Sequence, residues 1–128
     1  MQIRINLITT DKIMVEKVKI YFRERQDLKF LYSDHPVPVE DTEIYIAPVQ
    51  CIEKLSKYMR EEKRELSIIF YGNSQFLRKA FLTGCDDYLK NPWTIDELAI
   101  RVTKIIGKIE KQYVFPWGVI SIEGTDII

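Results

Sequence analysis

The stretch from Gly84 to Arg101 reads GCDDYLKNPWTIDELAIR and carries the most specific local pattern in the chain. Its first part, residues 86–89, has the length and composition of a short strand. The second part opens with a capping box, in which the Thr94 oxygen accepts a backbone N–H while Glu97 reaches back to the cap. Isoleucine, leucine and valine then recur at helical spacing, at residues 95, 98, 102, 105, 106 and 109. The stretch therefore predicts a strand, a turn and an amphipathic helix.

Upstream of this stretch, short apolar runs alternate with longer segments of helical period. Such alternation predicts βαβ units and a parallel sheet. Strands are predicted at residues 3–8, 28–32, 43–47, 66–71 and 86–89, and helices at about 12–25, 49–62, 74–82 and 94–109. Residues 33–41, SDHPVPVED, contain two prolines at a spacing that leaves no room for a helix,. The crossover helix between the second and third strands is therefore expected to be short or missing.

Composition limits the classes of protein to which the chain can belong. With 128 residues, 46% of them hydrophobic, it can bury one core but not two full domains,. Lys+Arg and Asp+Glu are equal at 19 each, so overall charge favours neither nucleic acid nor a membrane surface as partner,. Cys51 and Cys85 stand far apart, without disulfide or zinc spacing. The N-terminus has no signal-peptide pattern, and no apolar run approaches a membrane span. We expect a soluble cytoplasmic protein without metal, cofactor or membrane partner.

The order of elements and the tail G-C-D-D-Y-L-x-x-P-W-x-x-x-E-L-x-x-R resemble the receiver domain of two-component response regulators. The usual tail of that family is G-A-D-D-Y-L-x-K-P-F-x-x-x-E-L-x-x-R. The resemblance covers roughly residues 2–109 and is motif-specific from Gly84 to Arg101. It implies a flavodoxin-like, doubly wound α/β fold in residues 1–110, with a five-stranded parallel sheet in the order 2-1-3-4-5. The functional pocket is then expected at the carboxyl ends of the strands.

The resemblance also shows which parts of a phosphorylation site have changed. Receivers accept a phosphoryl group on an aspartate at the end of the third strand, and an acidic pair after the first strand helps to hold magnesium. Here Thr9 and Thr10 replace the acidic pair, and Asp11 alone follows them. The third strand ends in Ala47 and Pro48, so neither candidate acceptor position has a carboxylate.

The remaining pocket positions have changed as well. Asn91 aligns with the lysine that contacts phosphate in receivers, and Lys90 stands one residue out of register, where a strand side chain points to the opposite face,. The hydroxyl residue that takes part in the switch of receivers is expected at the end of the fourth strand, which here falls near Gly72 and Asn73. Pro92 is expected to follow a cis peptide bond, as in the family. Together these substitutions predict that aspartyl phosphorylation is absent. We expect no catalytic residue and no enzyme activity.

By the same resemblance, several charges occupy positions that regulators of the OmpR/PhoB type use for a two-fold dimer. Asp87, Glu97 and Arg101 stand where ion pairs form across helix four, strand five and helix five, and Asp86 and Lys108 are further candidates. An isologous interface needs each charge to meet its complement on an identical surface. The simpler interpretation is that these charges cap or solvate a strand end, since exposed ion pairs contribute only about 0–1 kcal/mol.

Two further positions bear on this face. Leu77 stands where a basic partner for Glu97 is expected, so the interface is predicted to be more apolar than usual, with Phe76 contributing. Tyr88 aligns with the aromatic residue of receivers whose side-chain rotamer changes when the domain switches state. The alternative for Tyr88 is a core tyrosine with its hydroxyl at the edge of the core.

Residues 111–128 are predicted to be a linker and the start of a truncated second domain. Val119, Ile120 and Ile122 indicate a short strand, and the following Glu-Gly-Thr-Asp indicates a turn,. The pattern resembles the opening platform of a winged-helix DNA-binding domain. A parent protein would then bind DNA through a C-terminal effector domain that these residues do not contain.

These features predict an atypical, phosphorylation-independent receiver domain that serves as a dimerisation and signal-input module of a transcriptional regulator. One alternative is a module that binds a protein or a small molecule, such as an anion or a metabolite, at the altered pocket. Another is an unconventional phosphoacceptor that uses Asp11 with a second carboxylate brought close. The sequence leaves open the input signal, the DNA target and whether a sensor kinase is a partner.

Overall fold

The computed structural model describes residues 2–35, 41–62 and 66–114. Its strands are β1 (Ile3–Ile8), β2 (Leu28–Ser33), β3 (Ile44–Pro48), β4 (Ser67–Gly72) and β5 (Asp87–Lys90). Its α-helices are α1 (Lys12–Tyr21), α2 (Ile52–Glu62), α3 (Leu77–Leu82) and α4 (Ile95–Val114), and 3-10 turns at Val49–Cys51 and Ser74–Phe76 precede α2 and α3. The predicted alternation of strands and helices is therefore confirmed.

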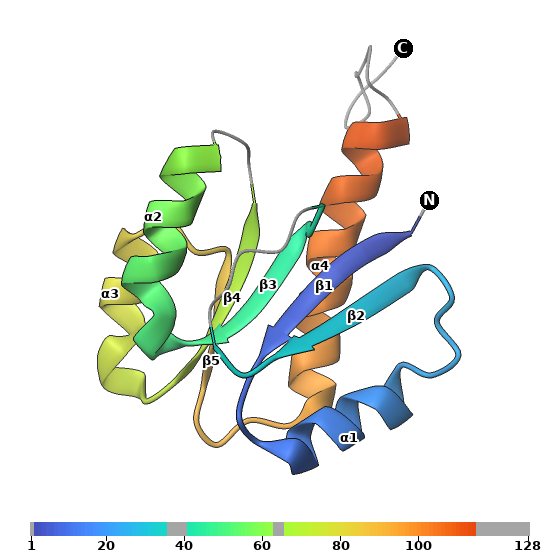
Figure 1. The fold of residues 1–128 in the computed structure, drawn as a ribbon, viewed down its shortest axis with the longest axis horizontal. Helices are drawn as coiled ribbons and strands as arrows, with labels where there is room; N and C mark the ends of the chain where they lie inside the picture. Colours follow the sequence, from blue (N-terminus) through green and yellow to red (C-terminus); the bar gives the residue numbers. More distant parts are fainter. Residues whose placement is uncertain (1, 36–40, 63–65, 115–128) are drawn as a thin grey trace.

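The five strands form one parallel sheet in the order β2-β1-β3-β4-β5, as predicted (Figure 1). Helices α1 and α4 cover one face of the sheet, and α2 and α3 cover the other. The order reverses between β1 and β3, because the chain leaves β1 toward β2 and later returns to β3. In such sheets the crevice at this point, at the carboxyl ends of the strands, is the usual binding site.

Both faces of the sheet are buried, and this explains why its central strands are almost wholly apolar. One core lies between the sheet and α1 with α4, where alternate β1 residues meet Val18 of α1 and Leu98 of α4. The second core lies between the sheet and α2 with α3, where Tyr45 and Phe70 meet Leu55. These cores hold each strand in one register, since a shift by one residue would turn its apolar side chains toward the wrong helices.

The capping box predicted for α4 is formed, whereas the ends of two helices differ from the prediction. Thr94 Oγ1 accepts a hydrogen bond from Glu97 N at 3.2 Å, and Glu97 Oε1 accepts one from Thr94 N at 3.0 Å, so the capping box of α4 is formed,. Helix α3 is followed by Gly84, whose φ of +95° is favourable for glycine,. Helix α1 is shorter than predicted and ends at Tyr21. Helix α4 continues to Val114, so residues 111–114 of the predicted linker are helical, while residues 115–128 lie outside the described residues.

The connection from β2 to β3 contains no helix in its described part, residues 34, 35 and 41–43, as the prolines predict. Asp34 and His35 therefore stay at the carboxyl end of β2.

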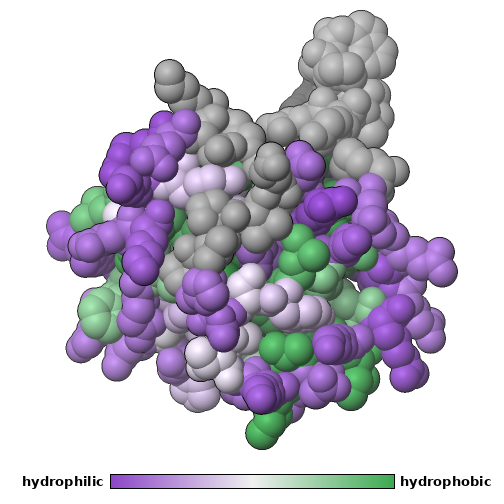
Figure 2. All heavy atoms as spheres, in the orientation of Figure 1, coloured by the Kyte–Doolittle hydropathy of each residue, from purple (hydrophilic) through white to green (hydrophobic). Residues whose placement is uncertain are grey.

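None of the helices in the described ranges is long and apolar enough to cross a bilayer. The exposed apolar side chains include Ile13, Ile20 and Tyr21, and hydrophobic surface is visible at the base of the molecule, near α1 (Figure 2).

Candidate functional site

A cavity of about 470 Å³ lies at the carboxyl ends of the strands, where the fold places a binding site,. The loops that follow β1, β3, β4 and β5 surround it, and β2 contributes from the side. Its lining residues are Ile8, Thr9, Thr10, Asp11, Met14, Asp34, Pro48, Gln50, Cys51, Tyr71, Gly72, Asn91 and Trp93. The cavity therefore combines apolar and aromatic walls with a few polar groups, which is the usual composition of a small-molecule site.

Six of the eight pocket positions predicted from the sequence line this cavity. They are Thr9, Thr10, Asp11, Pro48, Gly72 and Asn91. Ala47 does not, because its side chain is buried in the core under α2 and α3. Asn73 is exposed, and its Oδ1 accepts a hydrogen bond from Gln75 N at 3.2 Å. Lys90 is exposed and is not part of the lining, and the Asn91–Pro92 peptide bond is cis, as predicted.

Tyr71 is a cavity residue that connects β4 to β1. It extends from β4, and its hydroxyl donates a hydrogen bond to the carbonyl oxygen of Ile8 on β1 at 2.7 Å. Because β3 lies between these strands in the sheet, the phenol ring must pass over the end of β3. Burial is the main cause that raises the pKa of Tyr71, so the hydroxyl keeps its proton at neutral pH. Nothing local to β4 predicts this contact of Tyr71 with β1.

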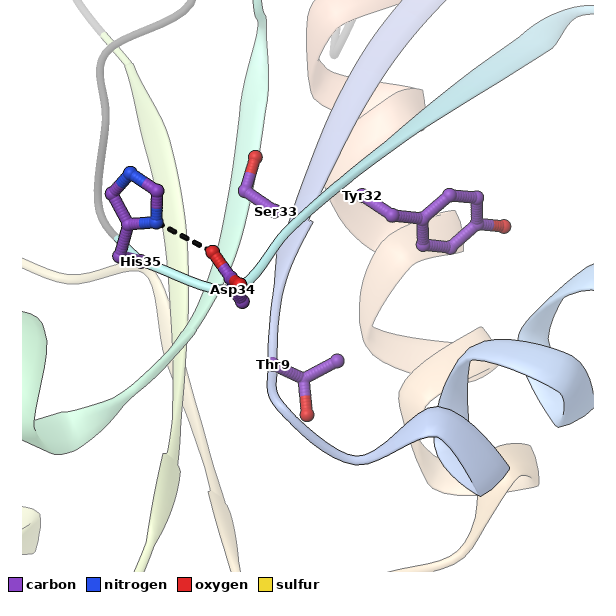
Figure 3. A pocket seen from close by; sticks show the side chains of 5 residues that line it. All are labelled: Thr9, Tyr32, Ser33, Asp34 and His35. Atoms are coloured by element: carbon purple, nitrogen blue, oxygen red, sulfur yellow. Dashed lines mark hydrogen bonds and ion pairs between the residues drawn. The ribbon is translucent and has the colours of Figure 1, made fainter.

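Asp34 is a cavity residue that the sequence analysis placed only in a loop. It lies directly after β2, beside Thr9 at the end of β1, and its carboxylate points toward His35 (Figure 3). Asp34 Oδ1 lies 2.5 Å from His35 Nδ1, and this hydrogen bond is the main cause that lowers the pKa of Asp34. Asp34 is therefore ionised at neutral pH. Only the short connection between β2 and β3 signalled that this residue would remain beside the cavity.

Asp11 supplies the second carboxylate and also caps α1. Its Oδ1 accepts hydrogen bonds from Ile13 N at 2.9 Å and Met14 N at 3.2 Å, while its own N–H donates to Thr9 Oγ1 at 3.0 Å. The carboxylate is thus held at the cavity wall. Among the described residues that line the cavity, Asp11 and Asp34 are carboxylates, and none is lysine, arginine or histidine. This composition does not favour the anion that the sequence analysis considered as a ligand.

Tyr88 points into the protein next to the cavity wall. Its side chain is only 3% exposed, and its hydroxyl donates a hydrogen bond to the carbonyl oxygen of Asn73 at 2.6 Å. Burial is the main cause that raises the pKa of Tyr88. A Cβ atom at Gly72 would lie 3.2 Å from the Tyr88 hydroxyl and 2.8 Å from Val49 Cγ1. The position predicted as a switch aromatic is therefore packed as part of the core.

Three of the charges predicted at a dimer interface have partners within the chain. Asp87 Oδ2 lies 3.0 Å from Arg101 Nε, a buried atom that makes no hydrogen bond of good geometry, so the contact is an ion pair. Asp86 Oδ2 accepts a hydrogen bond from Ile68 N at 2.8 Å and so satisfies a backbone N–H near the start of β4.

The remaining predicted interface residues have different environments. Glu97 belongs to the capping box of α4, and Lys108 is exposed. Leu77 packs partly against the core under α2 and α3, which leaves it less available to a partner than predicted. The exposed apolar residues on this side are Phe76, Phe81 and Leu82. Of these, the sequence analysis had considered only Phe76.

Neither cysteine is suited to act as a nucleophile at neutral pH. Cys51 lines the cavity, and burial raises the pKa of its thiol. Burial, followed by the charges of Asp86 and Asp87, raises the pKa of Cys85 to about 11. Both side chains therefore remain thiols, the poorly nucleophilic form. Within residues 2–35, 41–62 and 66–114, no group of three histidine, cysteine or acidic side chains could hold a metal ion.

Comparison with known proteins relates this geometry to a recognised fold. Neither a protein-family model nor a curated protein matches the chain. Among solved structures, the signal receiver domain of a putative Luxo repressor protein from Vibrio parahaemolyticus is similar, with a TM-score of 0.75 and 12% sequence identity over 93% of this chain and all of that one. The beryllofluoride-activated DrrB receiver domain has a TM-score of 0.64 and 19% identity over 84% of this chain and 99% of that one.

A third similar structure is longer than this chain. Full-length FixJ from B. japonicum has a TM-score of 0.68 and 16% identity, and the match covers 86% of this chain and 60% of FixJ. At these identities, structural similarity establishes the fold. The described part of the chain thus has the fold of response regulator receiver domains, as the motif from Gly84 to Arg101 predicts.

Proposed function

We propose that this chain is a receiver-type signal-input module that works without aspartyl phosphorylation, as part of a transcriptional regulator. The composition of the cavity is the observation that carries this proposal. β3 ends in Ala47 and Pro48, which have no carboxylate to accept a phosphoryl group, and Asn91 takes the place of the phosphate-binding lysine. The fold of a receiver domain is thus combined with a cavity that lacks the groups for phosphoryl transfer.

The position of Tyr71 supports the same conclusion on steric grounds. In a receiver the phosphoryl group forms above the end of the third strand, and here the Tyr71 ring passes over that point. The two carboxylates, Asp11 and Asp34, come instead from the loops that follow β1 and β2. Magnesium that serves phosphoryl transfer must contact both the protein and the transferring group. A metal held by these outer carboxylates would have no acceptor residue beside it.

Beryllofluoride, which mimics the aspartyl phosphate of receivers, provides the direct test. Trp93 lines the cavity and reports on it once Trp117 is replaced in a Trp117→Phe variant. We expect no saturable fluorescence change with magnesium and beryllofluoride, and no gain in intact mass after incubation with acetyl phosphate. The DrrB receiver domain serves as the positive control. A saturable response that Asp11→Asn abolishes would identify Asp11 as an unconventional acceptor and would overturn the proposal.

The surface formed by α3, β5 and α4 is the proposed site of self-association, and we call it the α3–β5–α4 face. It corresponds to helix four, strand five and helix five of the family, because one crossover helix is missing here. Phe76, Phe81 and Leu82 are exposed by 37%, 46% and 76%. Since Asp87 and Arg101 pair within the chain, apolar contacts around α3 would contribute most of the association,.

Leu82→Lys is expected to weaken self-association by at least about 10-fold without destabilising the fold, because a lysine would have to be desolvated in the interface. Sedimentation velocity over a range of concentrations measures this effect. Ile20→Lys, at a residue of α1 that is 63% exposed, is the matched control and should associate like the wild type. Arg101→Glu also breaks the pair with Asp87, so it is a less selective test. Equal association of Leu82→Lys and wild type would exclude this part of the face.

The link to DNA belongs to the same proposal. An effector domain that follows this chain would bind DNA, and the α3–β5–α4 face would hold two copies in position. The resemblance of the C-terminal residues to the start of a winged-helix domain supports this part. Those residues lie outside the described ranges.

A further inference from the structure

The cavity at the carboxyl ends of the strands has the wrong charge for a phosphate site. Phosphate and other anions are bound by basic side chains and by free N–H groups at helix N-termini. The lining within residues 2–35, 41–62 and 66–114 contains no lysine, arginine or histidine. The N–H groups of Ile13 and Met14 at the start of α1 already donate to Asp11. Asp11 and Asp34 therefore leave the cavity with negative charge that a bound cation would neutralise.

An aromatic wall lies beside these carboxylates. The rings of Tyr71 and Trp93 lie 5.5 Å apart between centroids, with an angle of 57° between their planes. Since the Tyr71 hydroxyl donates to Ile8, the tyrosine contributes its ring rather than a hydrogen-bond donor. Aromatic faces attract cations, tryptophan most strongly, and Met14 adds an apolar contact in the same wall,.

The size and remaining polar groups of the cavity fit an organic ion better than a metal ion. Its volume of about 470 Å³ lies within the roughly 300–1,000 Å³ of small-molecule sites,. Gln50, Asn91 and Thr10 provide neutral oxygen atoms that can accept hydrogen bonds from a ligand,. A metal ion would need a cluster of ligands, and the described residues contain no group of three that could form one.

We propose that this cavity binds a small organic cation, in which an ammonium group carries an apolar body. The ammonium group lies near Asp11 and Asp34, and the apolar body packs against Trp93 and Tyr71. Acidic side chains alone would not define such a site, but the volume of the open hollow and its aromatic wall give the ligand a shape as well as a charge. This inference deepens the proposed function, because it assigns a class of ligand to the same cavity.

Two basic residues lie near the carboxylates but outside the described lining of the cavity. His35 contacts Asp34 from the neighbouring hollow, which Thr9, Tyr32 and Ser33 also line (Figure 3). Lys17 lines another adjoining hollow together with Ile13 and Pro92. Neither histidine nor lysine is among the described residues of the cavity wall, so an ammonium group would meet Asp11 without a basic neighbour in that wall, and Asp34 beside its hydrogen bond to His35.

Choline and its neutral isostere 3,3-dimethylbutan-1-ol separate the effect of charge from that of shape. Both are titrated into the Trp117→Phe variant, with Trp93 fluorescence as the readout and calorimetry as a second measure of Kd. We expect a saturable change with choline and at least about 10-fold weaker binding of the alcohol, because only the cation gains from the carboxylates and the aromatic faces. Inorganic phosphate is the anionic comparison and is expected to give no saturable change.

Matched variants then test whether Asp34 and Asp11 contribute to choline binding. Asp34→Asn and Asp11→Asn are each expected to weaken choline binding by at least about 10-fold, and asparagine keeps the cap of α1 because it is as good an N-cap as aspartate. Glu53→Gln, an exposed acid on α2, should bind like the parent. Circular dichroism establishes that each variant is folded.

Several results would overturn the inference. They are the absence of a saturable change with choline, equal binding of the neutral alcohol, binding of phosphate in place of choline, and unchanged binding by both aspartate variants. The outcome is independent of the beryllofluoride experiment. If the chain responds to neither beryllofluoride nor choline, the proposed function stands and the proposed ligand class is wrong. A saturable response to beryllofluoride would overturn the proposed function itself.

Discussion

Replacing Tyr88 with alanine is expected to lower the free energy of unfolding by about 3–5 kcal/mol, the usual cost of truncating a buried aromatic residue. The side chain is 3% exposed and belongs to the core under α2 and α3. Tyr88→Phe keeps the ring and removes the hydrogen bond to the Asn73 carbonyl, so it should cost only about 1 kcal/mol,. Urea unfolding followed by circular dichroism measures both values.

Tyr21→Ala is the control for Tyr88, because Tyr21 is 47% exposed at the end of α1 and should cost less than about 1 kcal/mol,. The comparison decides between the two interpretations of Tyr88. Truncating a core residue lowers the free energy of unfolding strongly, whereas truncating a side chain that moves freely between the core and the surface does not. A cost below about 1 kcal/mol for Tyr88→Ala would therefore contradict the structural role and restore that of a switch.

Gly72→Ala is expected to lower the free energy of unfolding by about 2–4 kcal/mol, through a steric clash and backbone strain together. The added Cβ would lie 2.8 Å from Val49 Cγ1 and 3.2 Å from the Tyr88 hydroxyl. The backbone at Gly72 also has a φ of +155°, which residues with a Cβ rarely adopt,. Thermal unfolding should show the same loss as a clear decrease in Tm.

Gly107→Ala is the matched control for Gly72→Ala. Nothing lies within 4 Å of a Cβ at Gly107, and this glycine stands inside α4. Alanine should therefore stabilise the protein by about 0.5–1 kcal/mol. Adding Val49→Ala to Gly72→Ala separates the two causes, because removing the valine methyl groups relieves the clash and leaves the strain. A Gly72→Ala variant as stable as the wild type would contradict the packing described here.

The contacts of Gly72 and Tyr88 join the cavity to the proposed dimer face. Gly72 lines the cavity and lies against Val49 and the Tyr88 hydroxyl. Tyr88 in turn donates to the Asn73 carbonyl, directly before the 3-10 turn that leads into α3. A ligand that alters the cavity wall would therefore act on residues that position α3.

Local patterns predicted the elements of this fold well. The capping box at Thr94 and Glu97 indicated the start of α4 because its hydrogen bonds join residues only three positions apart. Buried strands gave continuous apolar runs, and the prolines of residues 33–41 excluded a helix before β3. In each case the deciding interaction lies within one element or its immediate neighbours, so sequence spacing contains the necessary information.

The partners of individual side chains within the chain were not predicted. Asp87 and Arg101 were predicted at a two-fold interface, and within the chain they form an ion pair with each other. Asp86 was expected at the same interface, and its carboxylate binds Ile68 N, eighteen positions earlier. A motif identifies which charges occupy a surface, but the distance between two charges depends on how β4, β5 and α4 pack.

The sequence by itself determined the order of strands and helices, the missing crossover helix and the absence of a carboxylate at the end of the third strand, because each depends on residue type at a known place along the chain. Only the tertiary structure decided which side chains meet at the carboxyl ends of the strands. Parallel strands bring their carboxyl ends to one edge of the sheet, so Asp34 and Asp11 line the same cavity there, and Tyr71 reaches across β3 to Ile8. The hydrogen bond between Tyr71 and Ile8 joins residues 63 positions apart, so no local spacing could indicate it.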